Sequence, residues 1–73
     1  MWTEYIEQKS GVLGGKPIIK GTRIAVDLIL EKIGAGESID DLVLAYPHIT
    51  REQLLACISY GAAVIRNETI IEV

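Results

Sequence analysis

Apolar residues recur at helical spacing in the middle of the chain, and a capping pattern precedes them. Ser38 and Asp41 have the spacing of a capping box, in which each side chain hydrogen-bonds the backbone N–H of the other. Pro47 has no N–H and forces the preceding residue out of the helical region, so it ends the helix. We therefore predict a helix over residues 39–46. Its apolar side repeats at i, i+3, i+4 and i+7: Ile39, Leu42, Val43 and Tyr46.

A second helix start follows directly after this proline. Thr50 and Gln53 form another capping box, and Ile49 and Leu54 stand at the two positions of a hydrophobic staple. These signals predict a helix over residues 51–66. Because only a short turn separates it from the preceding helix, the pair is expected to form a helix-turn-helix unit.

The preceding segment also has helical periodicity, and it predicts a first helix over residues 25–35. Gly36 follows as a natural residue to end that helix. This helix is expected to pack across the helix-turn-helix unit, which gives a mainly α domain with a three-helix core. Its apolar side comprises Val26, Ile29, Leu30 and Ile33.

Residues 1–24 read as a β-arm in front of the helices. A short strand is predicted near Glu4 to Glu7, with a short helical turn as the alternative. A glycine-rich loop follows, and Ile18 and Ile19 form the centre of a second strand. No linker or repeat divides the chain, so residues 1–73 are expected to form one domain.

The end of the chain is rich in β-branched residues, which favour strands. A possible short strand is predicted there, paired with the arm of its own chain or of a partner. The residues that suggest it are Thr69, Ile70, Ile71 and Val73.

The helix over 51–66 is apolar on two sides, a pattern typical of a helix that is covered twice. One side is expected to face the other two helices: Leu54, Leu55, Ile58, Ala62 and Ile65. The opposite side has small residues, which let another helix approach, and an aromatic anchor. It is therefore predicted to be a homodimer interface, with Ala56, Ser59, Tyr60 and Ala63 as its contacts.

Composition narrows the class of protein. A chain of 73 residues with 49% hydrophobic content builds a core with a thin stability margin, so we expect oligomerisation to add burial. Cys57 and His48 are single residues of their kind, too few for a four-ligand zinc site, and no cofactor or metal is expected. No apolar run reaches membrane-spanning length, and acidic residues stand where a signal peptide would have its basic region, so a cytoplasmic protein is expected.

Charge and motifs give few chemical candidates. The net charge of −3 argues against broad nucleic-acid binding but leaves room for a local basic patch. The run GVLGGKP has neither the spacing nor the Ser/Thr of a phosphate-binding P-loop, and we interpret it as a structural turn. The cations Lys16, Lys20 and Arg23 would suit phosphate contacts or an acidic partner, with a solvated strand face as the alternative.

The remaining candidate residues are expected to have structural roles. His48 is expected to be a surface turn residue, with a phosphate or partner contact as the alternative, and Cys57 a small packing residue. No nucleophile, base and oxyanion site come together in the sequence, so a catalytic site is not expected and the protein is predicted not to be an enzyme.

The chain has five short motifs, which are Gly15 to Pro17, Gly21 to Ile24, Gly36 to Ser38, Tyr46 to Thr50 and Tyr60 to Ala62. The stretch from Gly14 to Ala62 that carries them is similar to a family of small prokaryotic domains, catalogued as the domain of unknown function number four hundred and thirty-three. Many family members have proline where this chain has Ala25. The resemblance implies a homeodomain-like three-helix fold with an N-terminal β-arm.

Many members of that family are identified as VapB-type antitoxins, encoded beside a PIN-like ribonuclease toxin. The resemblance therefore implies a DNA-binding antitoxin that represses its own operon. Arg66, Ile70 and Ile71 would contact the toxin. In the antitoxin, the operator DNA would contact Lys16, Lys20, Arg23, Thr50, Arg51 and Gln53. The alternative to an antitoxin is a dimeric protein-interaction module without nucleic-acid binding.

Overall fold

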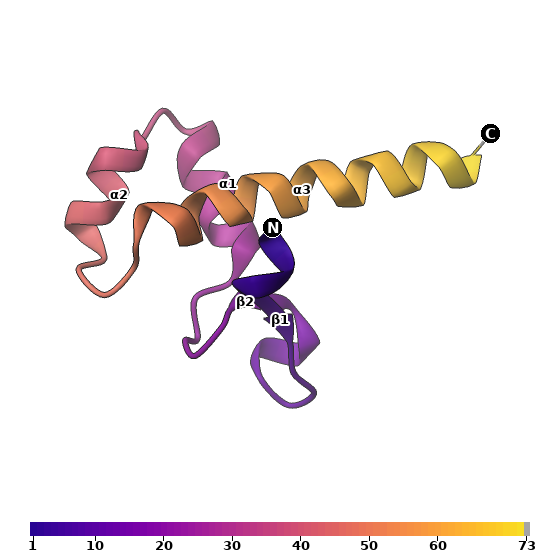
Figure 1. Cartoon of the computed structure of the whole chain (residues 1–73), viewed down its shortest axis with the longest axis horizontal. Coiled ribbons are helices and arrows are strands. Elements are labelled where there is room, and N and C mark those ends of the chain that lie inside the picture. Colours follow the sequence, from indigo (N-terminus) through magenta and orange to yellow (C-terminus); the bar gives the residue numbers. More distant parts are fainter. Residues whose placement is uncertain (73) are drawn as a thin grey trace.

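The computed structural model describes the backbone of residues 1–72 and the side chains of residues 1–66. It is mainly helical, with a two-stranded antiparallel sheet near the N-terminus (Figure 1), which confirms the predicted fold class. In chain order the elements are η1 (Trp2–Glu4), β1 (Ile6–Gln8), η2 (Leu13–Gly15), β2 (Pro17–Ile19), α1 (Val26–Gly34), α2 (Ile39–Ala45) and α3 (Arg51–Glu72).

The β-arm begins with a helical turn and continues as a hairpin, so both alternatives for its first residues occur in succession. β1 and β2 pair with Ile6 opposite Ile19 and Gln8 opposite Pro17. Ile6 and Ile19 are buried and join the core of the domain. The hairpin is therefore anchored to the helices through the apolar residues of its own strands.

Both predicted capping boxes are present. The Ser38 hydroxyl accepts from the Asp41 N–H at 3.0 Å, and the Asp41 carboxylate accepts from the Ser38 N–H at 3.2 Å. At the start of α3, the Gln53 side-chain oxygen accepts from the Thr50 N–H at 2.7 Å, and the Thr50 hydroxyl accepts from the Gln53 N–H at 3.2 Å. These bonds pair backbone donors that the first turn of a helix leaves unsatisfied, and they fix where α2 and α3 begin.

The core lies where α3 crosses α1, α2 and the hairpin. Its residues come from both strands, the three α-helices and the turn before α3, and all are apolar: Ile6, Ile19, Val26, Ile29, Leu42, Ile49, Leu54, Ala56 and Cys57. Gly61 brings α1 and α3 close, since a Cβ built on it would lie 3.1 Å from Cδ1 of Leu30. No helix within the described residues is long and apolar enough to span a membrane.

The predicted C-terminal strand is wrong. The backbone remains helical through Thr69, Ile70 and Ile71 as far as Glu72, while Val73 lies outside the described residues. Once a helix exists, each further residue gains a hydrogen bond for little additional order, whereas a strand needs a partner edge. Helix propagation therefore outweighs the β propensity of these residues, and α3 projects well beyond the body of the domain (Figure 1).

The inward side of α3 differs in part from the predicted one, although Leu54 is buried as expected. Ala56 and Cys57 are buried in the core, whereas Leu55, Ile58 and Ile65 are exposed. At 100° per residue, Gly61 lies between Leu54 and Cys57 around the helix, and this is the side on which α1 comes close. Of the predicted dimer contacts, Ala56 and Tyr60 are used within the chain itself.

Candidate functional site

The turn of the helix-turn-helix unit lies beside the loop that leaves the hairpin. Thr22, Arg23 and Ile24 line one side of a shallow groove, and residues 45–49 line the other. The loop is held in shape by the Thr22 hydroxyl, which donates to the Ile19 carbonyl at 2.7 Å and accepts from the Ile24 N–H at 3.0 Å. The arm and the turn thus present one continuous surface.

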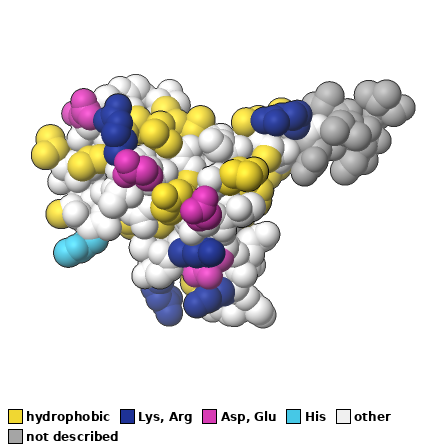
Figure 2. All heavy atoms as spheres, in the orientation of Figure 1, with side chains coloured by type: hydrophobic (Ala, Val, Ile, Leu, Met, Phe, Trp, Pro, Cys, Tyr) yellow, Lys and Arg dark blue, Asp and Glu magenta, His cyan; other side chains and the backbone are white. Residues whose placement is uncertain are grey.

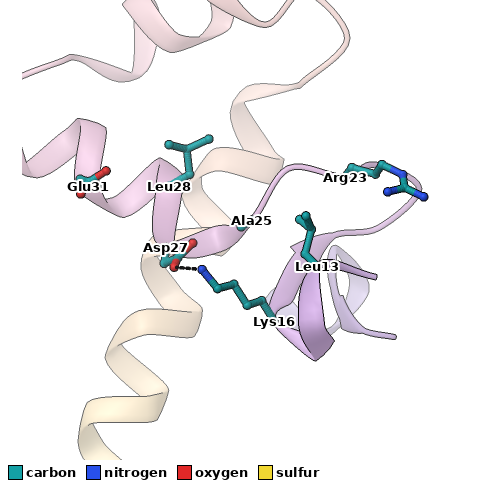
Figure 3. Close-up of a pocket in the computed structure, with 7 residues that line it drawn as sticks. All are labelled: Leu13, Lys16, Arg23, Ala25, Asp27, Leu28 and Glu31. Carbon is teal, nitrogen blue, oxygen red and sulfur yellow. Dashed lines mark hydrogen bonds and ion pairs between the residues drawn. The ribbon is translucent and has the colours of Figure 1, made fainter. Parts of the chain in front are cut away.

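Arg23 lies at the centre of this surface. It borders the groove at the turn and also a second, open concavity formed with Lys16, Leu28 and Glu31 (Figure 3). His48 is exposed and lines the same groove at the turn as Arg23. This pairing was not predicted, because the two residues are far apart in the sequence and no local pattern connects them.

Lys16 is partly neutralised by a neighbour. Its ammonium nitrogen donates to the Asp27 carboxylate at 3.1 Å, across the concavity between the arm and α1 (Figure 3). Both side chains are well exposed. An exposed ion pair contributes at most about 1 kcal/mol, so Lys16 can exchange Asp27 for another anion at little cost.

Arg51 is paired in the same manner. One of its guanidinium nitrogens donates to the Asp40 carboxylate at 2.7 Å and so links the first turns of α2 and α3. Thr50 and Gln53, the other two candidates at this end of α3, are engaged in the capping box. Lys20 is exposed, and its backbone N–H donates to the Tyr5 carbonyl. The six predicted DNA contacts therefore fall into two groups, one on the arm and one at the start of α3.

The predicted dimer and toxin contacts are distributed differently. Ser59 is exposed and Ala63 is half-buried, while Ala56 and Tyr60 face inward as described above. Arg66 is exposed on the part of α3 that projects from the body. The side chains of Ile70 and Ile71 lie outside the described part of the chain.

Cys57 is packed into the core, and burial raises the pKa of its thiol to about 11. The thiol therefore stays protonated and poorly nucleophilic at neutral pH. Within the described residues, no group of three His, Cys, Asp or Glu side chains is placed to hold a metal ion.

The sequence matches the family described as "Protein of unknown function (DUF433)" over residues 6–61, which is most of the chain. The chain belongs to this family. It is similar to a crystal structure of a DUF433 member protein from Anabaena variabilis, with a TM-score of 0.79 and 31% identity over 85% of this chain and 61% of that one. It is also 28% identical over 60 residues to "Uncharacterized protein y4eO" of Sinorhizobium fredii. That match covers 82% of this chain but only 27% of the relative, so the chain spans about a quarter of that protein's length.

In this DUF433 member the family motifs coincide with backbone features that shape the turns. The motif glycines Gly15, Gly21 and Gly36 all have positive φ, at 82°, 76° and 103°. The motif at 46–50 forms the turn before α3, and Tyr60 packs against the N-terminal turn. The motifs thus specify the fold, and among their residues that line the groove at the turn, Arg23, Pro47 and His48 are exposed.

Proposed function

We propose that the chain is a non-enzymatic, DNA-binding antitoxin that represses its own operon and pairs with a PIN-like ribonuclease toxin. One observation carries the proposal: Arg23 of the arm lines the same groove as the turn that precedes α3. A helix-turn-helix protein reads DNA with the first residues of its second helix, and a basic arm beside them adds phosphate contacts.

The DNA surface would comprise two groups of cations. Lys16, Lys20 and Arg23 project from the arm, and Arg51 stands at the first position of α3. Lys16 and Arg51 would exchange their exposed carboxylate partners for phosphates, at the small cost of an exposed ion pair. Thr50 and Gln53 would keep the N-terminal end of α3 in shape, through their capping box, while this end lies on the duplex.

The toxin surface would lie on the projecting part of α3. Arg66 is exposed there and offers a cation to the acidic metal site of a ribonuclease. The resemblance to antitoxins assigns Ile70 and Ile71 to the same contact. This half of the proposal rests on the family resemblance and on the extension of the helix beyond the body.

Fluorescence anisotropy with duplex DNA from upstream of the gene tests the DNA half. Four cations per chain, acting in a dimer, give a slope of log K against log salt of about −7. Arg23→Gln should weaken binding several-fold. Lys32→Gln is the matched control, because Lys32 loses the same charge but lies at the far end of α1, where it pairs with Glu37. Equal effects of the two variants, or a slope near zero, would refute DNA binding by this surface.

A pull-down of the tagged chain from its native host, read by mass spectrometry, tests the toxin half. Recovery of a PIN-like nuclease in stoichiometric amount supports it. Arg66→Ala should reduce that recovery, whereas Lys9→Ala on the arm should not. Recovery of the chain alone would refute the toxin contact.

The second candidate is a protein-interaction module without a nucleic-acid role. The specific observation in its favour is that Lys16 and Arg51 already have carboxylate partners in a chain of net charge −3. Salt-independent anisotropy combined with recovery of a protein partner would favour this candidate over the antitoxin.

A further inference from the structure

The outward side of α3 carries an apolar stripe, here the outer stripe, opposite the side that packs on the core. Its residues are large and exposed for their type: Leu55 is 46% exposed, Ile58 40% and Ile65 64%, and Ala62 between them is exposed too. Figure 2 shows hydrophobic surface over α3, leading toward the projecting part of the helix. Trp2 of η1 borders the outer stripe at Leu55, where both line one shallow hollow.

The spacing within the outer stripe is that of a helix seam. Leu55, Ile58, Ala62 and Ile65 are separated by three, four and three positions, which are the a and d positions of two successive heptads. The core-facing side of the same helix is a different one and carries Leu54, Ala56 and Cys57. The outer stripe is therefore a second, separate seam whose period suits another helix.

We propose that the outer stripe is where a second copy of this chain docks, with the two α3 helices antiparallel. In that arrangement Leu55 of one copy meets Ile65 of the other, and Ile58 meets Ala62, so every large side chain of the seam faces an apolar partner. A seam that pairs with itself in this way closes as a two-fold dimer. The dimer adds the burial that a chain of this size needs.

Charge complementarity favours a second copy in this orientation. Glu52 and Arg66 are both exposed and flank the outer stripe on the same side, about four turns apart at 3.6 residues per turn. Antiparallel pairing places Glu52 of each copy near Arg66 of the other, twice in the dimer. Parallel pairing would leave Glu52 of one copy about four turns from Arg66 of the other, so neither pair could form. A membrane surface is a poorer occupant, because interfacial helices carry a strongly basic polar face.

This inference goes beyond the proposed function and is tested without DNA or toxin. Light scattering after size exclusion should give twice the 8.0 kDa chain mass at about 100 µM, a concentration at which interfaces of modest size are occupied. Ile58→Lys should return the mass to a single chain. Leu44→Lys is the matched control, because Leu44 is 81% exposed on α2, away from the outer stripe. A wild-type monomer, or a dimer that survives Ile58→Lys, would overturn the proposal.

Ile65→Lys serves as a second variant, since Ile65 is the more exposed residue and its substitution disturbs the fold of one chain less. Far-UV circular dichroism should show an unchanged helix content per folded chain in both variants. Loss of dimer mass in Ile65→Lys with retained helix supports the outer stripe as the interface, even if Ile58→Lys fails to fold.

A charge swap tests the orientation. Glu52→Arg or Arg66→Glu alone should raise the dissociation constant of the dimer about tenfold, because each creates two like-charge contacts. The double variant should restore wild-type affinity, since both contacts then reform with their signs exchanged. In a parallel dimer the two residues do not meet, so the single variants and the double variant should all keep an affinity close to that of the wild type. Single variants with unchanged affinity, or a double variant without recovery, would overturn the antiparallel arrangement.

Discussion

Trp2 and Tyr60 meet edge to face, with ring centroids 4.8 Å apart and an interplanar angle of 81°. The contact joins the N-terminal turn to the middle of α3, and it explains why Tyr60 is not on an open face. Edge-to-face aromatic pairs contribute about 1 kcal/mol beyond the area they bury.

A double-mutant cycle on this pair should therefore give a coupling free energy of about 1 kcal/mol. Trp2→Ala alone should lower the free energy of unfolding by about 2 kcal/mol, since Trp2 is only partly buried. Urea denaturation followed by circular dichroism measures both quantities, because the variant lacks the one tryptophan of the chain. Additive single effects would show that η1 does not dock on α3 through these rings.

Two glycines at the end of α1 should respond to alanine in opposite directions. Gly36 has φ of 103°, a conformation that costs an L-residue about 1 kcal/mol, so Gly36→Ala should destabilise the domain. Gly34 is helical with open space around its Cα, so Gly34→Ala should stabilise by roughly 0.5 kcal/mol. Thermal melts of the two variants check the signs. A loss of stability in both would mean that Gly34 has a role that the helix geometry does not require.

The buried thiol of Cys57 should make stability fall at alkaline pH. Its pKa is about 11 in the folded chain against a reference value of 9.0, so both states bind the proton below pH 9 and there is no penalty. Between pH 9 and 11 the unfolded thiol ionises first, and the free energy of unfolding should drop by up to about 1.4 kcal/mol per pH unit.

Cys57→Ala is the control for this measurement, because it removes the thiol and keeps every other ionisable side chain. Urea midpoints at pH 8, 9 and 10 should show the advantage of the wild type over Cys57→Ala shrinking as pH rises. A constant difference would show that the thiol ionises equally in both states.

Substitutions at Asp40 and at Asp41 distinguish the contribution of an ion pair from that of a helix cap. Asp40→Asn releases Arg51 and should change the free energy of unfolding by less than about 0.5 kcal/mol, while strengthening the proposed DNA binding. Asp41→Asn adds the same charge but weakens the capping box, so it should cost about 1 kcal/mol. Anisotropy and thermal melts compare the two. An equal gain in DNA affinity would assign the effect to net charge, not to Arg51.

Local signals in the sequence predicted most of the fold. The capping boxes at Ser38 and Thr50 and the helix stop at Pro47 act through neighbouring residues, and the structure has them where the pattern places them. The end of α3 could not be predicted in this way, because β-branched residues there favour a strand until an existing helix extends over them.

The faces of α3 needed information that a single helix does not contain. Apolar residues recur at helical spacing on both sides of α3, so its own sequence does not show which side faces the core. That depends on how closely α1 approaches, which is set by the contact between Gly61 and Leu30. The groove shared by Arg23 and His48 likewise depends on how the arm folds back on the turn. The sequence supplied the basic residues of the candidate site but not their neighbours.

The close approach at Gly61 has a consequence for how relatives of this chain can vary. An alanine there would need the end of the Leu30 side chain to move by a few tenths of an ångström or to be shortened. We therefore expect the two positions to covary across the family, with a side chain at the position of Gly61 accompanied by valine or alanine at that of Leu30. The distance between α1 and α3 would then depend on this pair of residues, and a substitution at one position would require a compensating substitution at the other.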